Sequence, residues 1–284
     1  MAGQRVRTER PMRQPLVLRL GRHALLITGA ALVVVPFLWM FTTSLQSRAE
    51  TYTNTSVIPT SWNWENYLTA WEAAPFGQYY LNSVVMAVGI VSSHLVFDAM
   101  AAYAFARLTF PFRNAIFVVL LAALMVPTFV TIIPAYTIVA DLGWIDTYAA
   151  LIVPRMADVF GIILLRQFFV SIPHELEDAA RIDGCSRIGT FLRIIVPLSR
   201  PAFATLAIFS FLFAWNDFLW PLLVTNTDEV RTIQIGLSSF VGRYGTSWNY
   251  LMAGTLTATV PSILVFLFFQ RALVRGITTS GLKD

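Results

Sequence analysis

The sequence predicts an all-α membrane protein with six transmembrane helices, and its composition is the first reason. Of its 284 residues, 56% are hydrophobic and 13% are charged, whereas about a quarter of a soluble domain is charged. The mean hydropathy is +0.64. One soluble core cannot hide this much apolar surface from water, so lipid is the expected solvent. The apolar runs do not alternate with polar residues as the strands of an outer-membrane barrel do.

The second reason is that six windows have the low charge of a transmembrane helix and its length of about 20 residues. The first window follows a basic leader, but it is too long for a signal peptide and no small-residue cleavage site ends it. We therefore expect it to be retained. The predicted helices cover residues 24–45, 79–105, 115–138, 147–168, 202–224 and 249–270.

The basic residues predict the orientation of these spans. Of the 20 Lys and Arg residues, sixteen fall on one side of the predicted membrane and three on the other. The positive-inside rule then places both termini in the cytoplasm. The formal net charge of +4 is thus a topology signal and does not indicate nucleic-acid binding. The chain divides into a basic cytoplasmic segment (1–22), a six-span domain (23–272) and a cytoplasmic tail (273–284).

Single residue counts exclude several function classes. The only lysine, Lys283, is followed by Asp284, so the chain has no phosphate-binding loop of the Gly-Lys-Ser/Thr type. The only cysteine, Cys185, excludes an internal disulfide and a cysteine-based metal site. The three histidines lie far apart in the sequence and make no plausible metal cluster. We expect no catalytic residue and no metal site in this chain.

The cytoplasmic loop 171–201 has a pattern of its own. Pro173 suits the start of a helix, acidic residues occupy its first turn at the positive end of the helix dipole, and Gly184 suits its end. A second amphipathic stretch covers residues 188–196. A short helix tied to spans on both sides is suited either to transmit motion or to rest on lipid. The residues alone leave both interpretations open.

These residues, together with others in the spans, resemble one known family. The run from Glu177 to Gly184, followed by Ile194–Leu198, resembles the EAA loop of ABC importer permeases. More narrowly, the chain is similar to the shorter permease of carbohydrate importers of the maltose type, from about residue 24 to its end. The other matching segments are 36–40, 43–45, 101–107, 166–169, 215–218, 252–254 and 269–271.

The resemblance implies the fold of a type I ABC importer permease, in which helix 174–184 is a cytoplasmic coupling helix. It implies a second permease subunit, a dimer of ABC ATPase subunits that bind ATP and Mg²⁺, and an extracytoplasmic substrate-binding protein. No cofactor is then expected on this chain itself. The location implied is the plasma (inner) membrane of a bacterium or archaeon. ATP-driven movement of the docked helix would rock the spans between inward and outward states.

The resemblance also implies which residues dock on the ATPase. The motif usually has Glu where this chain has Asp178, which keeps the charge but is one methylene shorter. The neighbouring Glu177 is the alternative partner. The candidate coupling residues are Glu177, Asp178, Ala179, Ala180, Asp183 and Gly184.

Charged residues inside the predicted spans are candidates for function because charges are costly in lipid. Arg155 and Asp158 are three residues apart, so on one helix they share a face and can pair. They are either a structural ion pair or part of a translocation path. Asn216 and Asp217 either line the same path or are hydrated near the external end. Asp98 has no assigned role and either pairs across helices or stays protonated.

The function implied by the resemblance is uptake of an oligo- or disaccharide. Glycerol-3-phosphate or a polyol is the nearest alternative, because those importers share the same permease motifs. An ion-coupled secondary transporter is the alternative from another class, although six spans are few for one and no inverted repeat is evident. Whether transport follows ATP or an ion gradient distinguishes these classes.

Overall fold

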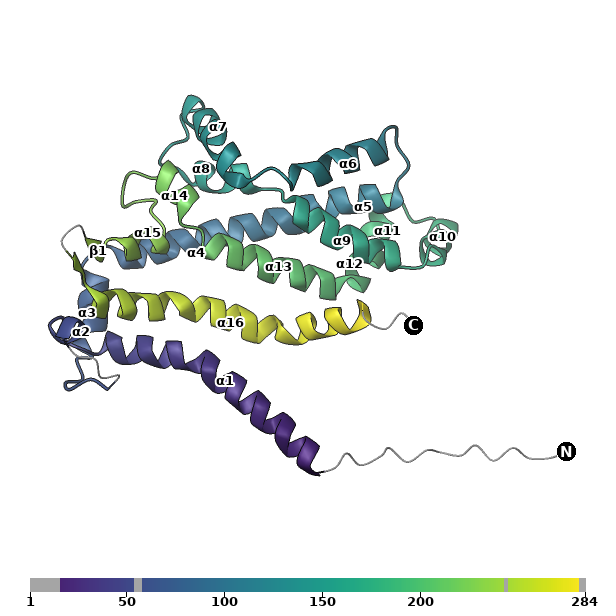
Figure 1. Ribbon diagram of the computed structural model, residues 1–284. Helices are drawn as coiled ribbons and strands as arrows, with labels where there is room; N and C mark the ends of the chain where they lie inside the picture. The colour runs from purple at the N-terminus through teal and green to yellow at the C-terminus, as the bar shows by residue number, and fades with distance from the viewer. Residues whose placement is uncertain (1–15, 54–57, 243–244, 281–284) are drawn as a thin grey trace.

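The protein is a bundle of long helices, shown in Figure 1. The computed structural model describes residues 16–53, 58–242 and 245–280. The predicted terminal segments 1–22 and 273–284 therefore lie partly outside the described residues. Helices dominate the described ranges, as the composition predicts.

Three helices in the described ranges are individually long and apolar enough to cross a membrane. They correspond to the first, second and last predicted spans. The second is a continuous rod with a π-helical segment of 5 residues in its middle. The three are α1 (Leu16–Ser44), the rod made of α4 (Phe76–Ser93), η1 (His94–Asp98) and α5 (Ala99–Arg107), and α16 (Trp248–Ser280).

Three further pairs of helices meet the same test only when both members are counted together, which gives up to 6 spans. The members of these pairs are bent relative to each other by 101°, 43° and 79°, in chain order. The first pair is α6 (Arg113–Ala123) with α7 (Thr128–Asp141), and the second is α8 (Tyr148–Ile152) and η2 (Val153–Arg155) with α9 (Val159–Ser171). The third is α11 (Arg187–Thr190), η3 (Phe191–Ile195) and α12 (Val196–Leu198) with α13 (Arg200–Trp215).

The first two bent pairs correct the prediction of single helices at 115–138 and 147–168. Pro127 precedes α7, and a proline offers no N–H and disfavours the helical conformation in the residue before it. In the second pair Pro154 lies in a 3-10 turn, and Asp158 is extended, with φ −131° and ψ 130°, before α9 begins. Both breaks therefore have a local cause in the sequence.

The predicted helix 202–224 is also broken, because α13 ends at Trp215 and a separate helix, α14 (Leu219–Val224), follows. The Asn216 amide donates to the carbonyl of Leu212 over 2.8 Å. The Asp217 carboxylate accepts the N–H of Trp220 over 3.4 Å. Side chains of Asn and Asp compete for backbone groups in this way, which favours a helix end over its continuation.

The shorter elements gather at the two ends of the bundle. In Figure 1, α10 lies at one end, and α2, α3 and the hairpin lie at the other. The hairpin pairs two antiparallel strands, and such strands are an addition to the predicted all-α class. These elements are α2 (Glu50–Thr53), α3 (Glu65–Glu72), α10 (Glu175–Ile182), α15 (Ile233–Ser238), β1 (Val241–Gly242) and β2 (Gly245–Thr246).

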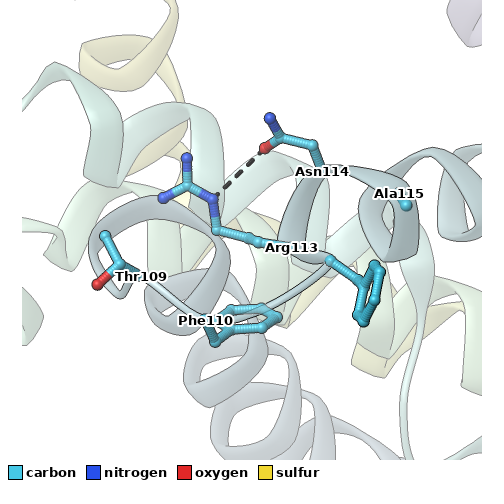
Figure 2. Close-up of a pocket in the computed structure, with 6 residues that line it drawn as sticks. Thr109, Phe110, Arg113, Asn114 and Ala115 are labelled. Carbon is cyan, nitrogen blue, oxygen red and sulfur yellow. Dashed lines mark hydrogen bonds between the residues drawn. The ribbon is translucent and has the colours of Figure 1, made fainter.

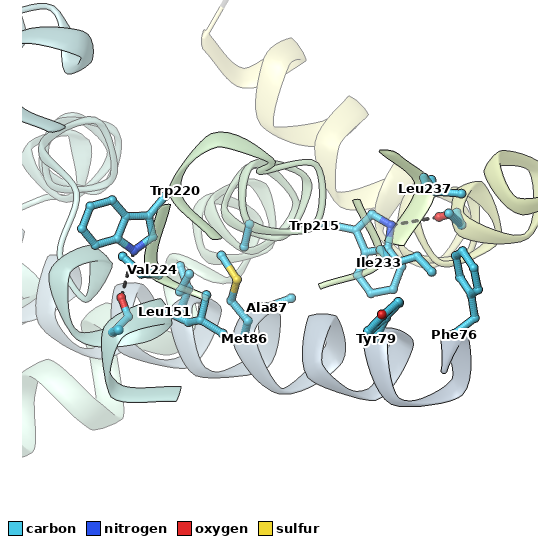
Figure 3. Close-up of a cluster of buried hydrophobic side chains, with 14 of the residues drawn as sticks. Phe76, Tyr79, Met86, Ala87, Leu151, Trp215, Trp220, Val224, Ile233 and Leu237 are labelled. Atoms are coloured by element: carbon cyan, nitrogen blue, oxygen red, sulfur yellow. Dashed lines mark hydrogen bonds between the residues drawn. The ribbon is translucent and has the colours of Figure 1, made fainter. Parts of the chain in front are cut away.

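Two apolar clusters hold the helices together. The cluster in Figure 3 lies toward the end opposite α10 and contains Trp215 and Trp220. Their indole N–H groups donate to the carbonyls of Ala258 and Ala150, each over 2.9 Å. The second cluster packs α5 against α9 and includes Phe169. Each large aromatic residue thus fills space between helices, while the indoles also satisfy backbone carbonyls.

Polar side chains fix the segment before α15 to α4. The buried Asn82 donates to the carbonyls of Glu229 and Arg231 over 2.9 and 2.8 Å. Asp146, in the turn before α8, accepts the N–H groups of Asn226 and Thr227 over 2.9 and 3.1 Å. Burial alone would raise the pKa of Asp146, but these hydrogen bonds outweigh it and lower the pKa below its usual value. At the end opposite α10, the segment 226–231 is therefore held by several hydrogen bonds with Asn82 and Asp146.

Gly161 provides a test of the close contact between α9 and η1. A Cβ at this position would overlap Oδ2 of Asp98 and lie 2.9 Å from a methyl group of Leu206. We expect Gly161→Ala to lower the free energy of unfolding by about 1–3 kcal/mol through overpacking. Gly77→Ala is the control, because nothing lies within 4 Å of its Cβ position. Thermal unfolding in detergent measures both, and equal melting temperatures would contradict the close packing.

Candidate functional site

The helix α10 is built as the sequence predicts and stands at one end of the bundle (Figure 1). Its first turn carries three acidic residues, which suit the positive end of the dipole. After its last residue, Gly184 adopts φ +80°, and the N–H groups of Gly184 and Cys185 donate to Arg181 and Ala180 over 3.0 and 2.9 Å. This is a Schellman motif, and its left-handed residue is the reason that glycine suits this position.

The predicted coupling residues divide between two faces of α10. Asp178, Ala179, Asp183 and Gly184 are exposed, and the Asp178 side chain is 64% exposed, with an ion pair to Arg181 at 3.2 Å. Ala180 and Glu177 are buried instead. Three apolar side chains on and beside the helix are exposed as well. They are Leu176, Ile182 and Ile188.

We call Asp178, Ala179 and Ile182 the outward face of α10. They lie within about 100° of one another at 100° per residue, opposite the buried Glu177 and Ala180. Ile182 is 87% exposed at the end of the helix. A small surface that combines a carboxylate with a protruding apolar side chain is suited to contact another protein.

Glu177 faces the interior of the protein and is only 3% exposed. Its Oε1 lies 3.0 Å from Nε of Arg107, and the hydroxyl of Tyr103 donates to its Oε2 over 3.3 Å. The Nη2 of Arg107 donates in turn to the carbonyls of Phe169 and Ile172, at the end of α9. Glu177 therefore already has a partner within its own chain, which the sequence reasoning did not foresee.

A hollow of about 340 Å³ lies at the loop between α5 and α6 (Figure 2). It is lined by Phe112, which has φ 60° and is 81% exposed, and by Arg113. Arg113 directs its donors to the carbonyl of Leu108 and the side chain of Asn114. Because these donors are already used within the loop, we assign no chemistry to this hollow.

The charged residues inside the spans are arranged differently from the prediction. Arg155 and Asp158 lie on either side of the break between η2 and α9, so the expected pair on one continuous helix is wrong. Arg155 pairs instead with Asp217, at 2.9 Å between Nη2 and Oδ2. The Arg155 guanidinium also lies over the rings of Phe213 and Trp220, at 5.0 and 5.9 Å. Asp217, at the break between α13 and α14, is thus the counter-ion of Arg155, at the break before α9.

Asp98 and His94, both on η1, complete this polar cluster. Oδ1 of the fully buried Asp98 accepts the backbone N–H of Asp158 over 2.9 Å. Both expected roles of Asp98, pairing across helices or protonation, stay predictions, and its ion-pair distance in the described residues is to His94 on the same segment, at 4.0 Å. Nε2 of His94 donates to the carbonyl of Arg155 over 2.8 Å, and Nδ1 lies 2.8 Å from the hydroxyl of Ser210. A carbonyl only accepts, so Nε2 carries a proton. His94 was considered only as a metal ligand in the sequence, and no local pattern indicates this contact.

The cluster borders a cavity of about 420 Å³. Its lining combines three phenylalanine side chains with charged groups from the break at η2. Asn216 does not line it, and its amide donates to its own helix instead. The lining residues are His94, Thr128, Pro154, Arg155, Ala157, Asp158, Phe160, Phe209, Ser210 and Phe213.

Asp98 provides a test of this cluster. Asp98→Ala should lower the free energy of unfolding by about 1–3 kcal/mol, because it leaves the half-buried N–H of Asp158 without its acceptor. Asp98→Asn should stay close to the unmodified protein, since its side-chain oxygen can still accept. Thermal unfolding in detergent compares them. A loss as large for Asn as for Ala would mean that the negative charge, and not the acceptor, is required.

A family model and the similar proteins all describe membrane components of transport systems. A family model described as "Binding-protein-dependent transport system inner membrane component" matches residues 99–279. The arabinooligosaccharides transport system permease protein AraQ of Halalkalibacterium halodurans is 34% identical over 258 residues, which cover 89% of this chain and 92% of that protein. The sn-glycerol-3-phosphate transport system permease protein UgpE of Yersinia enterocolitica is 35% identical over 267 residues, which cover 91% and 95%.

Two solved structures share the fold. A bacterial ABC transporter involved in the import of the acidic polysaccharide alginate contains a chain with a TM-score of 0.80 and 21% identity, which covers 94% of this chain and 100% of that one. A bacterial alginate ABC transporter in complex with an alginate pentasaccharide-bound periplasmic protein gives a TM-score of 0.58 at 16% identity, covering 89% and 95%. At these identities the likeness shows the fold alone.

Proposed function

Because this chain belongs to the family of inner-membrane components of binding-protein-dependent transport systems, we propose that it is a permease subunit of an ATP-driven importer for a neutral sugar. The observation that carries the proposal is the outward face of α10, which is exposed at one end of a bundle whose chain has no phosphate-binding loop of the Gly-Lys-Ser/Thr type. Such a chain needs another protein to supply ATP hydrolysis and a surface on which that protein docks.

The assembly that we propose has four components besides the lipid membrane. A second permease completes the pathway, a dimer of ABC ATPase subunits binds ATP and Mg²⁺ and docks on α10, and an extracytoplasmic binding protein delivers the solute. The alginate transporter complex with its periplasmic protein is a precedent for the last of these. This chain itself then needs no cofactor and performs no catalysis.

The membrane arrangement that we propose has six spans, with each bent pair counted as one. The end of the bundle where α10 lies would face the cytoplasm, together with both termini, because the basic residues concentrate there. The ends of α1 and α16 that belong to the terminal segments lie toward that side in Figure 1. The host membrane would be the plasma membrane of a bacterium or archaeon.

The cavity beside Arg155 is our candidate for part of the translocation path. Arg155 is neutralised by Asp217, and the Asp158 side chain has no hydrogen-bond partner among the described residues. The cluster therefore holds the Arg155 cation against three acidic side chains, those of Asp98, Asp158 and Asp217. Carboxylates accept hydrogen bonds from hydroxyl groups, and the rings of Phe160 and Phe209 offer apolar faces to a sugar ring.

Glycerol-3-phosphate is the second candidate solute, favoured by the likeness to the permease UgpE. An anion would meet the excess of carboxylate at this cavity, which disfavours it. An ion-coupled secondary transporter is the candidate from another class, and the buried Asp98 and the half-buried Asp158 are the features it would use. Transport that follows a proton or sodium gradient without ATP would support it and overturn the importer.

Ile182→Asp tests whether α10 docks on an ATPase. A carboxylate forced into an apolar contact must lose its hydration, so we expect the amount of copurifying ATPase to fall by roughly tenfold or more. The fold should be unaffected, because Ile182 is exposed. Val241→Asp is the control, because Val241 is an exposed apolar residue at the opposite end of the protein. Mass spectrometry of the purified complex gives the amounts, and full ATPase recovery with Ile182→Asp would contradict docking at α10.

The solute class is tested with the complete transporter in liposomes, supplied with its binding protein and ATP. We expect uptake of neutral oligosaccharides and none of glycerol-3-phosphate. Asp217→Asn leaves the Arg155 cation unpaired, so it should reduce the discrimination against the anion. Uptake of glycerol-3-phosphate in preference to the neutral sugars by the unmodified transporter would overturn the assignment of a neutral solute while leaving the permease function intact.

A further inference from the structure

We propose that the buried ion pair between Arg107 and Glu177 is the joint that passes movement of α10 to the membrane helices. Both side chains are almost fully buried, at 1% and 4% exposed. The proposal rests on the proposed function, in which an ATPase docks on the outward face of α10. Arg107 and Glu177 are thus positioning residues, and neither contacts the ATPase or the solute.

The joint connects three elements through one side chain. Arg107 is the last residue of α5, and its guanidinium contacts Glu177 on α10 and donates to the carbonyls of Phe169 and Ile172 at the end of α9. The end of a helix leaves its last carbonyls without partners inside the helix. The carbonyl of Phe169 accepts from Arg107 and also from the N–H of Ile172. A displacement of α10 therefore acts on α5 and α9 together.

A fourth element closes the joint from another side. Tyr103, one turn before Arg107, donates to Glu177, and its ring lies 4.9 Å from that of Phe191 on η3. The ring of Phe191 also contacts Phe169, at 6.4 Å between centroids. The side of α10 that carries Glu177 thus packs against neighbouring helices, whereas its outward face is exposed in this chain.

Stability alone does not explain why the ion pair between Arg107 and Glu177 is buried. Replacing a buried ion pair with apolar residues of similar volume is often neutral or stabilising, because both charges lose their hydration on burial. In the described part of the chain, Nη1 of Arg107 is buried and has no hydrogen-bond partner. What the two residues provide is directional contact, because Tyr103 donates to Glu177 and Nη2 of Arg107 donates to the end of α9. These hydrogen bonds fix α10 relative to α5 and α9 in a way that apolar packing does not.

Movement of α9 can be measured at its start, which is the end far from α10. Asp158 and Phe160, at the start of α9, line the cavity together with Thr128. We would place a single reporter thiol in the cavity with Thr128→Cys, in a background carrying Cys185→Ser. The assembled transporter is labelled with a membrane-impermeant maleimide, with and without ATP, Mg²⁺ and vanadate. This measurement needs no knowledge of the solute.

In the unmodified joint we expect nucleotide trapping to change the labelling rate. Glu177→Gln and Arg107→Lys should reduce that change by about tenfold, a typical size for coupling between sites, while the ATPase still copurifies and hydrolyses ATP. Glu175→Gln is the matched control, because Glu175 is an exposed acid on the same helix. It should behave as the unmodified protein does.

The double variant Arg107→Met with Glu177→Leu separates transmission from stability. Its apolar pair avoids an unpaired buried charge, so it keeps the assay informative even if the single variants fail to assemble. We expect it to bind the ATPase and to lose the nucleotide-dependent labelling. Normal nucleotide-dependent labelling in this double variant, or in Glu177→Gln, would overturn the joint alone. No nucleotide dependence with the unmodified joint would overturn the proposed function itself, and the joint with it.

Discussion

The structure depends on the requirement that backbone groups in lipid find their partners within the protein. A continuous helix meets this requirement by itself, but three of the apolar helix pairs in the described residues are bent at a break by 43° to 101°. At the break before α9, the freed N–H of Asp158 is accepted by Asp98, and the carbonyl of Arg155 accepts from His94. The carbonyl of Ala150 accepts from Trp220. Asp98, His94 and Trp220 are thus placed where they satisfy backbone groups at the break before α9.

The two ends of the bundle are held together in different ways, and the difference bears on how the protein moves. At the end opposite α10, many separate hydrogen bonds fix one segment, including those of Asn82 and Asp146. At the other end, the polar contacts between α10 and α5 converge on Glu177, which contacts both Arg107 and Tyr103, and Arg107 also donates to the end of α9. Many separate bonds favour a rigid arrangement, whereas contacts that converge on one residue concentrate force at that residue.

The sequence predicted the membrane class, the long helices and the start and end of α10, because these depend on composition and on nearest neighbours. It did not predict which charges meet. Arg155 and Asp158 were paired on the assumption of a continuous helix, and the break at η2 invalidates that spacing. The inward position of Glu177 depends on Arg107, 70 residues earlier, and no local pattern distinguishes it from its exposed neighbour Asp178.

The helix α9 connects the two candidate sites. It has 13 residues, so it is about 20 Å long at 1.5 Å per residue. Its first residues follow Asp158, whose N–H is held by Asp98 beside the cavity, and its last carbonyls are held by Arg107 at the base of α10. A rigid rod fixed at both ends cannot shift at one end without shifting at the other. The same helix therefore gives a docking event at α10 a direct physical route to the residues that line the cavity.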